Sequence, residues 1–210
     1  MDNFVITISR GYGSGGKTIG ERLAKEFGIQ CYDFEILEMA SEKSGINTNL
    51  FSKSDENVKN MPFFKTLFAR GVFKKGKMIP PSSKDFVSDE NLFNYQAAVM
   101  HELAQKESCV LVGRAADHVL KDFDNVLRLN VQAPFESCVN TVSEMFSISK
   151  DEAEKKIKRI DKERSAYYKY YTGKEWNDVS NYDISINSDM GWDKCIELIK
   201  IALNLKLKKA

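Results

Sequence analysis

The residues with the clearest chemical meaning lie near the start of the chain, where glycines and hydroxyl side chains precede a lysine. The segment Gly11-Tyr-Gly-Ser-Gly-Gly-Lys-Thr18 fits the pattern G-x-x-x-x-G-K-S/T at every defined position. Glycines let the backbone wrap so that successive N–H groups point inward at phosphate oxygens, and a helix N-terminus adds partial positive charge. We therefore predict a binding site for the phosphates of ATP, formed by Gly11, Gly13, Ser14, Gly15, Gly16, Lys17 and Thr18.

Two side chains of this loop are expected to act directly on the nucleotide. Lys17 is predicted to reach the β- and γ-phosphates as a catalytic residue, and the Thr18 hydroxyl is predicted to ligate Mg²⁺. The alternative is a glycine-rich turn that only caps a helix. Because glycine makes up about 7% of residues in general, a chance match in a chain of this length occurs on the order of one time in a hundred. The pattern favours the phosphate site.

The hydrophobic patterns around the loop predict alternating strands and helices. Residues 4–9 are apolar and β-branched, which is typical of a buried strand, and Ile19, Leu23 and Phe27 then recur at helical spacing until Gly28. Further strands are expected at residues 29–32, 109–112, 126–131 and 182–187, with helical patterns after them. Strands that alternate with helices imply an α/β fold with a parallel sheet covered on both faces.

The overall composition is that of a soluble globular protein, with 42% hydrophobic residues, 29% charged residues and a net charge of +1 over 210 residues. This balance gives no argument for binding nucleic acid or a membrane. The apolar runs are far shorter than the roughly 20 residues that span a bilayer. The first residues show no secretion signal, so we expect a cytoplasmic protein. The four cysteines are widely separated and are expected to be reduced, largely buried thiols.

One segment departs from this balance. Between Lys59 and Lys84 there are seven basic residues and no acidic one, with phenylalanines interleaved among them. Residues 50–90 also contain prolines and glycines without a clean period, which predicts an irregular or partly helical, mobile insertion. We favour a flap that binds the phosphate of an acceptor molecule, with Arg70 as a substrate-binding residue. A plain solvated insertion, stacking on nucleic acid and contact with a membrane are the alternatives.

Several motifs together resemble those of the cytidylate kinase-like family. They are Ile8-Ser-Arg-Gly-Tyr-Gly-Ser-Gly-Gly-Lys-Thr18, Cys31-Tyr-Asp-Phe-Glu-Ile-Leu37, Val112-Gly-Arg-Ala-Ala-Asp117, Arg159-Ile-Asp-Lys-Glu-Arg164, Tyr167-Tyr168 and Tyr182-Asp-Ile-Ser-Ile-Asn187. The resemblance covers nearly the whole chain, with residues 50–90 as the poorly matched part. It implies the nucleoside monophosphate kinase fold, a three-layer P-loop domain over residues 1–210 with about five parallel strands. It also implies an acceptor-binding insertion at residues 46–91 and a helical lid at residues 149–175.

The resemblance assigns roles to side chains outside the loop. Asp33 follows the second predicted strand, at the edge where ligands of open α/β sheets bind, and is expected to hold the acceptor or Mg²⁺. Arg114, after the next strand, belongs to the acceptor site. Arg159 and Arg164 match lid arginines, which as catalytic residues neutralise charge on the transferred phosphoryl group. On their own, such residues are usually solvated or salt-bridged groups.

The chain also departs from the pattern of well-characterised cytidylate kinases. Phe34 stands where those proteins have a small hydroxyl residue after the aspartate, and no Arg or Lys occurs from Val131 to Ser149, where similar proteins have an arginine. No aspartate directly follows the strand at residues 109–112, so Asp33 is expected to supply the carboxylate for Mg²⁺. The tyrosines from residue 167 to 171 are expected either to stack on adenine or to pack at the lid hinge.

These predictions together describe an ATP-dependent phosphotransferase whose partner is a small phosphate acceptor. A nucleoside monophosphate is the favoured acceptor, with CMP or dCMP implied by the resemblance alone. A kinase of the same fold that acts on another small molecule is one alternative, and a non-catalytic nucleotide-binding regulatory module is another. The presence of Lys17, Thr18 and both lid arginines argues against the last, because a protein that only binds nucleotide has little need for lid charges.

Overall fold

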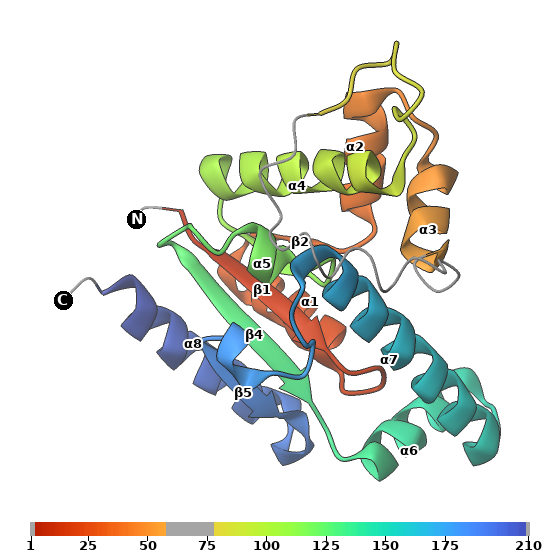
Figure 1. Cartoon of the computed structure of the whole chain (residues 1–210). Coiled ribbons are helices and arrows are strands. Elements are labelled where there is room, and N and C mark those ends of the chain that lie inside the picture. The colour runs from red at the N-terminus through yellow and green to blue at the C-terminus, as the bar shows by residue number, and fades with distance from the viewer. Residues whose placement is uncertain (1–2, 58–77, 209–210) are drawn as a thin grey trace.

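The centre of the structure is one parallel sheet (Figure 1). The computed structural model describes residues 3–57 and 78–208 of the chain. The strands are β1 (Val5–Arg10), β2 (Gln30–Tyr32), β3 (Cys109–Val112), β4 (Val126–Gln132) and β5 (Ile184–Asn187). They lie in the order β2-β3-β1-β4-β5, and each neighbouring pair is parallel. The predicted five-stranded parallel sheet is confirmed, and the carboxyl ends of all its strands lie along one edge.

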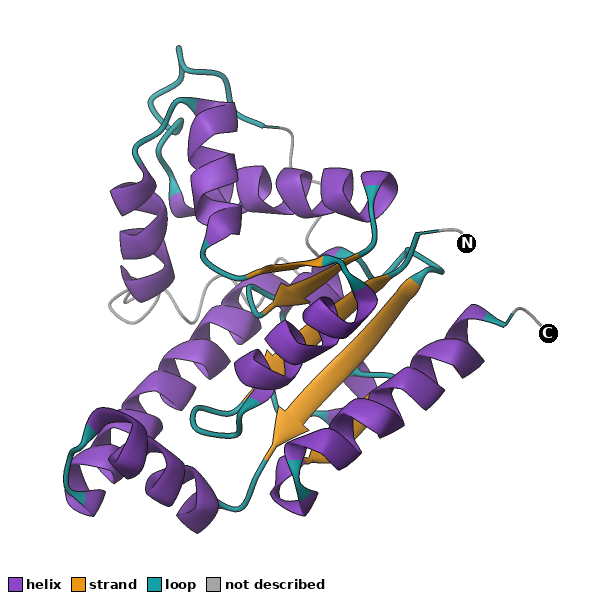
Figure 2. Ribbon diagram, turned by 180° about the vertical axis from the view of Figure 1, so that it is seen from behind, coloured by secondary structure: helices purple, strands orange, loops and turns teal. Residues whose placement is uncertain are grey.

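Helices cover both faces of this sheet (Figure 2). They are α1 (Gly16–Phe27), α2 (Glu35–Ser44), α3 (Thr48–Asn57), α4 (Asp89–Lys106), α5 (Ala116–Val119), α6 (Phe135–Phe146), α7 (Lys150–Thr172) and α8 (Trp192–Leu207). Two short 3₁₀ turns, η3 (Val179–Asn181) and η4 (Ser188–Met190), flank β5. None of the helices in the described ranges is long and apolar enough to cross a membrane.

The alternation of side chains along the strands explains the two covered faces. In β3, Cys109 and Leu111 join the core formed with α2, α4 and α5, whereas Val110 and Val112 join the core formed with α1 and α8. Successive side chains of a strand point to opposite faces, so a strand that is apolar at every position must be buried on both. All four residues of β3 are fully buried. The sheet is therefore the middle of three layers.

The structure refines several predicted boundaries. The first strand extends through Arg10, one residue further than its apolar pattern indicates. Part of the segment expected to be irregular is helix α3, and the helix after β3 is a single turn. Helix α7 spans most of the predicted lid and begins with a capping box between Ser149 and Glu152. Arg70 lies outside the described residues, so its predicted role stays a prediction.

Candidate active site

The predicted phosphate loop connects the end of β1 to the start of α1, at the carboxyl edge of the sheet. Its backbone depends on glycine at two points, because Gly13 has φ +85° and Gly15, the residue before the helix, has φ +76°. A Cβ atom at Gly13 would also approach the carbonyl oxygen of Cys138 to 2.8 Å. Since the first N–H groups of a helix have no intrahelical partner, the start of α1 offers donors and partial positive charge to an anion.

Ser14 holds the loop in shape. Its hydroxyl is buried and lies 2.9 Å from the carbonyl oxygen of Gly11 and 3.1 Å from that of Val131. The Ser188 hydroxyl donates in turn to the carbonyl oxygen of Ser14 at 2.6 Å. The side chain of Ser14 therefore faces the protein and ties the loop to β4, and any part of this residue in binding nucleotide falls to its backbone.

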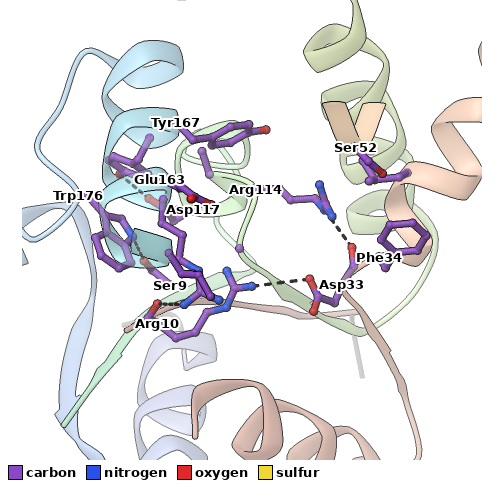
Figure 3. Close-up of a pocket in the computed structure, with 16 residues that line it drawn as sticks. Ser9, Arg10, Asp33, Phe34, Ser52, Arg114, Asp117, Glu163, Tyr167 and Trp176 are labelled. Atoms are coloured by element: carbon purple, nitrogen blue, oxygen red, sulfur yellow. Dashed lines mark hydrogen bonds and ion pairs between the residues drawn. The ribbon is translucent and has the colours of Figure 1, made fainter. Parts of the chain in front are cut away.

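Charged side chains from three adjacent strands meet beside the loop (Figure 3). Asp33 follows β2, and its carboxylate lies 3.2 Å from Lys17 Nζ and 3.7 Å from an Nη atom of Arg10. Arg114, which follows β3, donates from Nε to the backbone oxygen of Asp33 at 3.0 Å. The structure thus brings together the predicted residues Lys17, Asp33 and Arg114 and adds Arg10, the last residue of β1.

Helix α7 docks on this cluster through Arg164. An Nη atom of Arg164 donates to the backbone oxygen of Arg10 at 3.0 Å, and the guanidinium lies over the ring of Tyr12. Asp161 lies 3.7 Å from Arg164 and accepts a hydrogen bond of 2.8 Å from the backbone N–H of Tyr12. Two side chains of the helix therefore bind the backbone of the strand end and the loop.

Arg159, the other predicted lid arginine, has a different environment. Its side chain is 63% exposed and pairs with Glu163, one turn further along α7, at 3.1 Å. It does not line the cavity that Arg164 lines. An exposed i,i+4 ion pair contributes only about 0.3–0.5 kcal/mol, so this pair costs little to break when a ligand competes for the arginine.

Burial and neighbouring charges shift the pKa values of these groups. Burial lowers the pKa of Arg10 to about 9, and the positive charge of Arg164 adds to this effect while Asp33 opposes it. Burial also lowers the pKa of Arg164. Partial burial acts in the same direction on Lys17, but the Asp33 carboxylate outweighs it and raises the pKa of this ammonium group. A site that crowds cations in this way favours an anionic ligand, which would relieve their repulsion.

A cavity of about 290 Å³ opens next to the cluster. Its floor includes Arg10 and Arg114 at the ends of β1 and β3. One side is formed by Phe34 and Ser52, and the other by residues of α7 and by Trp176, as Figure 3 shows. Leu37 of α2 also lines the cavity. The cavity is therefore cationic at its floor and partly aromatic at its sides.

A buried polar network supports the α7 side of the cavity. Tyr168 donates to the carboxylate of Asp117 at 2.6 Å, and the hydroxyl of Ser9 accepts from the indole of Trp176 at 2.7 Å. Tyr171 stacks on Phe93 with 4.0 Å between ring centroids. These buried contacts agree with the prediction that tyrosines pack at the lid hinge, although Tyr167 and Tyr168 also line the cavity.

A second cavity of about 280 Å³ borders the loop elsewhere. It is lined by Gly13 and Ser14 of the loop, by polar residues of α6 such as Ser137, and by Asp189 and Trp192. The hydroxyl of Ser137 donates to the carboxylate of Asp189 at 2.6 Å, so polar groups are available at its surface. The phosphate loop thus borders this second cavity, whereas the first cavity opens beside Arg10, the residue directly before the loop.

The donor set fits the predicted Mg²⁺ ion. Within the described ranges, no group of three or more His, Cys, Asp or Glu side chains is gathered for a metal. Mg²⁺ often takes only one or two protein oxygen ligands and completes its shell with waters and substrate phosphates. The Thr18 hydroxyl and the Asp33 carboxylate, the latter beside Lys17, would supply such oxygens. Their predicted metal-binding role depends on a bound nucleotide.

The sequence analysis assigned no individual role to Arg10, Asp161, Asp117 or Trp176, although all four contribute to the site. Arg10 carried a usable signal, because an arginine at the end of a buried strand and directly before Gly11 must lie at the ligand edge of the sheet. Asp161 and Trp176 carried none, because their partners Tyr12 and Ser9 are 149 and 167 residues away in the chain.

The strand order and the phosphate loop between β1 and α1 define a P-loop kinase fold. The Cytidylate kinase-like family matches residues 5–190, and the chain belongs to this family. A cytidylate kinase from Methanosarcina mazei is 26% identical over 95% of this chain and 96% of its own length. An uncharacterized protein from Eubacterium ventriosum has a solved structure with a TM-score of 0.69, 22% identity and coverage of 96% and 99% of the two chains. A shikimate kinase from Bacteroides thetaiotaomicron, with a TM-score of 0.51, 12% identity and coverage of 96% and 98%, shares the fold.

Proposed function

We propose that this protein transfers the γ-phosphoryl group of ATP to a nucleoside monophosphate, with CMP and dCMP as the first acceptors to test. The observation that carries the proposal is the convergence of Lys17, Arg10 and Arg114 on Asp33, beside a cavity that Arg164 also lines. A cavity of about 290 Å³ with a cationic floor suits a small phosphorylated molecule. The family and its relatives named cytidylate kinase support the choice of acceptor.

The position of each residue in the site suits it to a different part of the two substrates. The loop and Lys17 would hold the β- and γ-phosphates, and the second cavity would receive the nucleoside part of the donor. Arg114 would hold the acceptor above the sheet edge, and Arg164 lies between the loop and the acceptor cavity. Phosphoryl transfer depends mainly on positioning and on neutralising charge, so no strong general base is required among these side chains.

Mg²⁺ would supply charge neutralisation on the donor phosphates when it is bound by Thr18 and Asp33. Asp33 also pairs with Lys17 and Arg10, which keeps these cations at the sheet edge. Arg159 would leave its exposed pair with Glu163 when phosphates are bound, and it would add a further positive charge.

The direct test is the release of ADP by the purified protein with ATP and Mg²⁺. Acceptors would be CMP, dCMP, UMP, AMP, GMP and non-nucleotide alcohols, with Lys17→Ala as the inactive control. Turnover with CMP or dCMP that the control lacks would support the proposal. Turnover only with another small molecule would favour the same-fold alternative, for which exposed Phe34 at the cavity is the relevant observation. ATP binding without any turnover would favour a regulatory module.

A further inference from the structure

Arg10 is the least explained charged residue of the site. Only 16% of its side chain is exposed, yet its charged group lines the cavity. Its Nε atom is buried and has no hydrogen-bond partner among the residues that the structure describes. The carboxylate of Asp33 is 3.7 Å from its Nη2 atom, beyond hydrogen-bond distance. A buried guanidinium with unused donors is costly unless a ligand binds it.

The Arg10 side chain occupies a space beside Gly113 that the Cβ atom of any other residue would fill. Gly113, directly after β3, has φ +80°, and a methyl group there would overlap the guanidinium of Arg10. The guanidinium therefore extends from β1 across the end of β3 towards Asp33 at the end of β2. This is the side of the acceptor cavity, where Arg114 also lies, and not the side of the second cavity.

We propose that Arg10 is a direct ligand of the acceptor's phosphate group. It would bind this group in the cavity that Arg114 and Arg164 also line. The inference rests on the proposed function and names the residue that fixes the acceptor for transfer. The planar fork of an arginine can bind two phosphate oxygens at once, which a lysine cannot do. The 3.7 Å ion pair with Asp33 orients the guanidinium of Arg10.

The described part of the chain offers two observations in support of this role. No Arg or Lys occurs from Val131 to Ser149, so α6 brings no cation to the phosphates. Arg164 already uses one Nη atom to bind the backbone oxygen of Arg10, and Arg114 uses Nε to bind the backbone oxygen of Asp33. Among the described arginines that line this cavity, Arg10 is thus the one whose guanidinium has no hydrogen bond to a described residue, while α7 fixes its backbone oxygen. A purely structural ion pair with Asp33 would not require the cleared space at Gly113.

Steady-state kinetics of four variants test the proposal. Arg10→Met removes the charge, Arg10→Lys keeps the charge without the fork, and Gly113→Ala leaves Arg10 in the chain but displaces its guanidinium. Gly28→Ala is the matched control, because Gly28 has φ +66° but a Cβ atom there meets nothing within 4 Å. It reports the effect of backbone strain alone.

We expect Arg10→Met and Gly113→Ala to raise the KM of the acceptor roughly 10- to 100-fold, as for the loss of hydrogen bonds to a charged group. The KM of ATP should stay within about twofold, Arg10→Lys should lie in between, and Gly28→Ala should match the wild type. A parallel rise of both KM values would show that Arg10 only shapes the loop. Unchanged kinetics in Arg10→Met would show that it contacts no substrate. Either result overturns the proposal.

A binding experiment separates this proposal from the proposed function. Inorganic phosphate is titrated into wild type, Arg10→Met and Gly113→Ala while a non-hydrolysable ATP analogue with Mg²⁺ saturates the loop, and thermal stability is followed against chloride of equal ionic strength. We expect phosphate to stabilise wild type and Gly28→Ala only. If no acceptor is ever phosphorylated but this pattern holds, the function is wrong and the Arg10 site stands. If Arg10→Met is stabilised like wild type, the Arg10 site is wrong.

Discussion

Two parts of the proposed active site are built in opposite ways. The phosphate floor, made of Arg10, Asp33, Arg114 and the loop at residues 11–18, is tied by hydrogen bonds and ion pairs to three strands and to α7. The acceptor wall, made of Phe34, Leu37 and Ser52, includes an aromatic ring that is 48% exposed. The floor is arranged before any ligand binds, whereas the wall presents surface that a ligand would cover.

This difference separates chemistry from specificity. Phosphate groups are common to all the substrates considered, so a floor that binds them can be rigid and built from the backbone. The part of the acceptor that differs between substrates must meet the wall. Substitutions in the floor should therefore weaken phosphate binding or turnover for every acceptor alike, and substitutions in the wall should act on the choice of acceptor.

The largest effect is expected for Lys17→Ala. Loss of the ammonium group removes a charge that would neutralise the transferred phosphoryl group, and we expect kcat to fall by about 100- to 1,000-fold. ADP release under saturating substrates measures it. Lys25→Ala, an exposed lysine on the same helix, should retain wild-type turnover. Similar rates for Lys17→Ala and the wild type would remove the basis for assigning transfer chemistry to the floor.

The second expectation compares the two arginines of α7. Arg164→Ala should lower kcat about 100-fold and also lower thermal stability, because its guanidinium joins α7 to the backbone of Arg10. Arg159→Ala should lower kcat only about tenfold and leave stability unchanged, because its exposed pair with Glu163 contributes little. Lys158→Ala, which breaks a similar exposed pair with Glu154, is the control for that helix surface. Equal losses of stability for both arginine variants would contradict the preformed docking of α7.

The sequence predicted the floor better than the wall, and the reason is distance along the chain. The loop motif, the strand before it and the helix after it are contiguous, so residues 4–28 could be assigned from spacing alone, and the structure places β1 and α1 there. Asp33 and Arg114 were placed correctly at the sheet edge because each follows a strand. The structure separates Arg164 from Arg159, but equal motif matches cannot show which side of α7 faces the loop.

The wall could not be predicted because no local pattern encodes it. Residues 50–90 lack a clean period, and α3 lies within them although its sequence has few apolar residues. Ser52 reaches the cavity only because α3 packs beside α2 and α4, which requires the tertiary fold. The contact of Tyr168 with Asp117 joins α7 to α5 across 51 positions of the chain, so residue spacing could not predict it either.

The third expectation concerns the buried hydrogen bond between Tyr168 and Asp117 on the α7 side of the cavity. Burial raises the pKa of Asp117 from 3.8 to about 6, although the hydrogen bond from Tyr168 opposes the shift. The folded state therefore binds more protons than the unfolded state between these values, so Asp117 makes the free energy of unfolding fall as pH rises from about 4 to 6, by on the order of 2 kcal/mol. Asp117→Asn should lose this slope in urea unfolding measured at several pH values.

The control for this measurement is Asp85→Asn, which changes an exposed carboxylate on a surface turn. Other buried carboxylates, such as Asp161, contribute equally to wild type and to both variants, so only the difference between the curves is interpreted. A slope in Asp117→Asn as steep as that of the wild type would show that Asp117 ionises freely in the folded protein. The Asp117 carboxylate on the α7 side of the cavity would then be less buried than the structure indicates.

The smallest effect, and the sharpest test of the comparison, is expected at the acceptor wall. Phe34 directly follows Asp33 and exposes its ring at the cavity, so a planar base held above the floor could stack on it. We expect Phe34→Ser to raise the KM of a nucleoside monophosphate about tenfold, in line with the cost of removing one base-stacking ring. The KM of ATP and the kcat at saturation should change less than about twofold.

The control is Phe146→Ser, which changes another exposed phenylalanine, at the end of α6, and should alter neither kcat nor the KM of the acceptor. A fall in kcat without a change in acceptor KM would give Phe34 the behaviour expected of Lys17. The separation between chemistry and specificity would then fail at the position where wall and floor are adjacent in sequence.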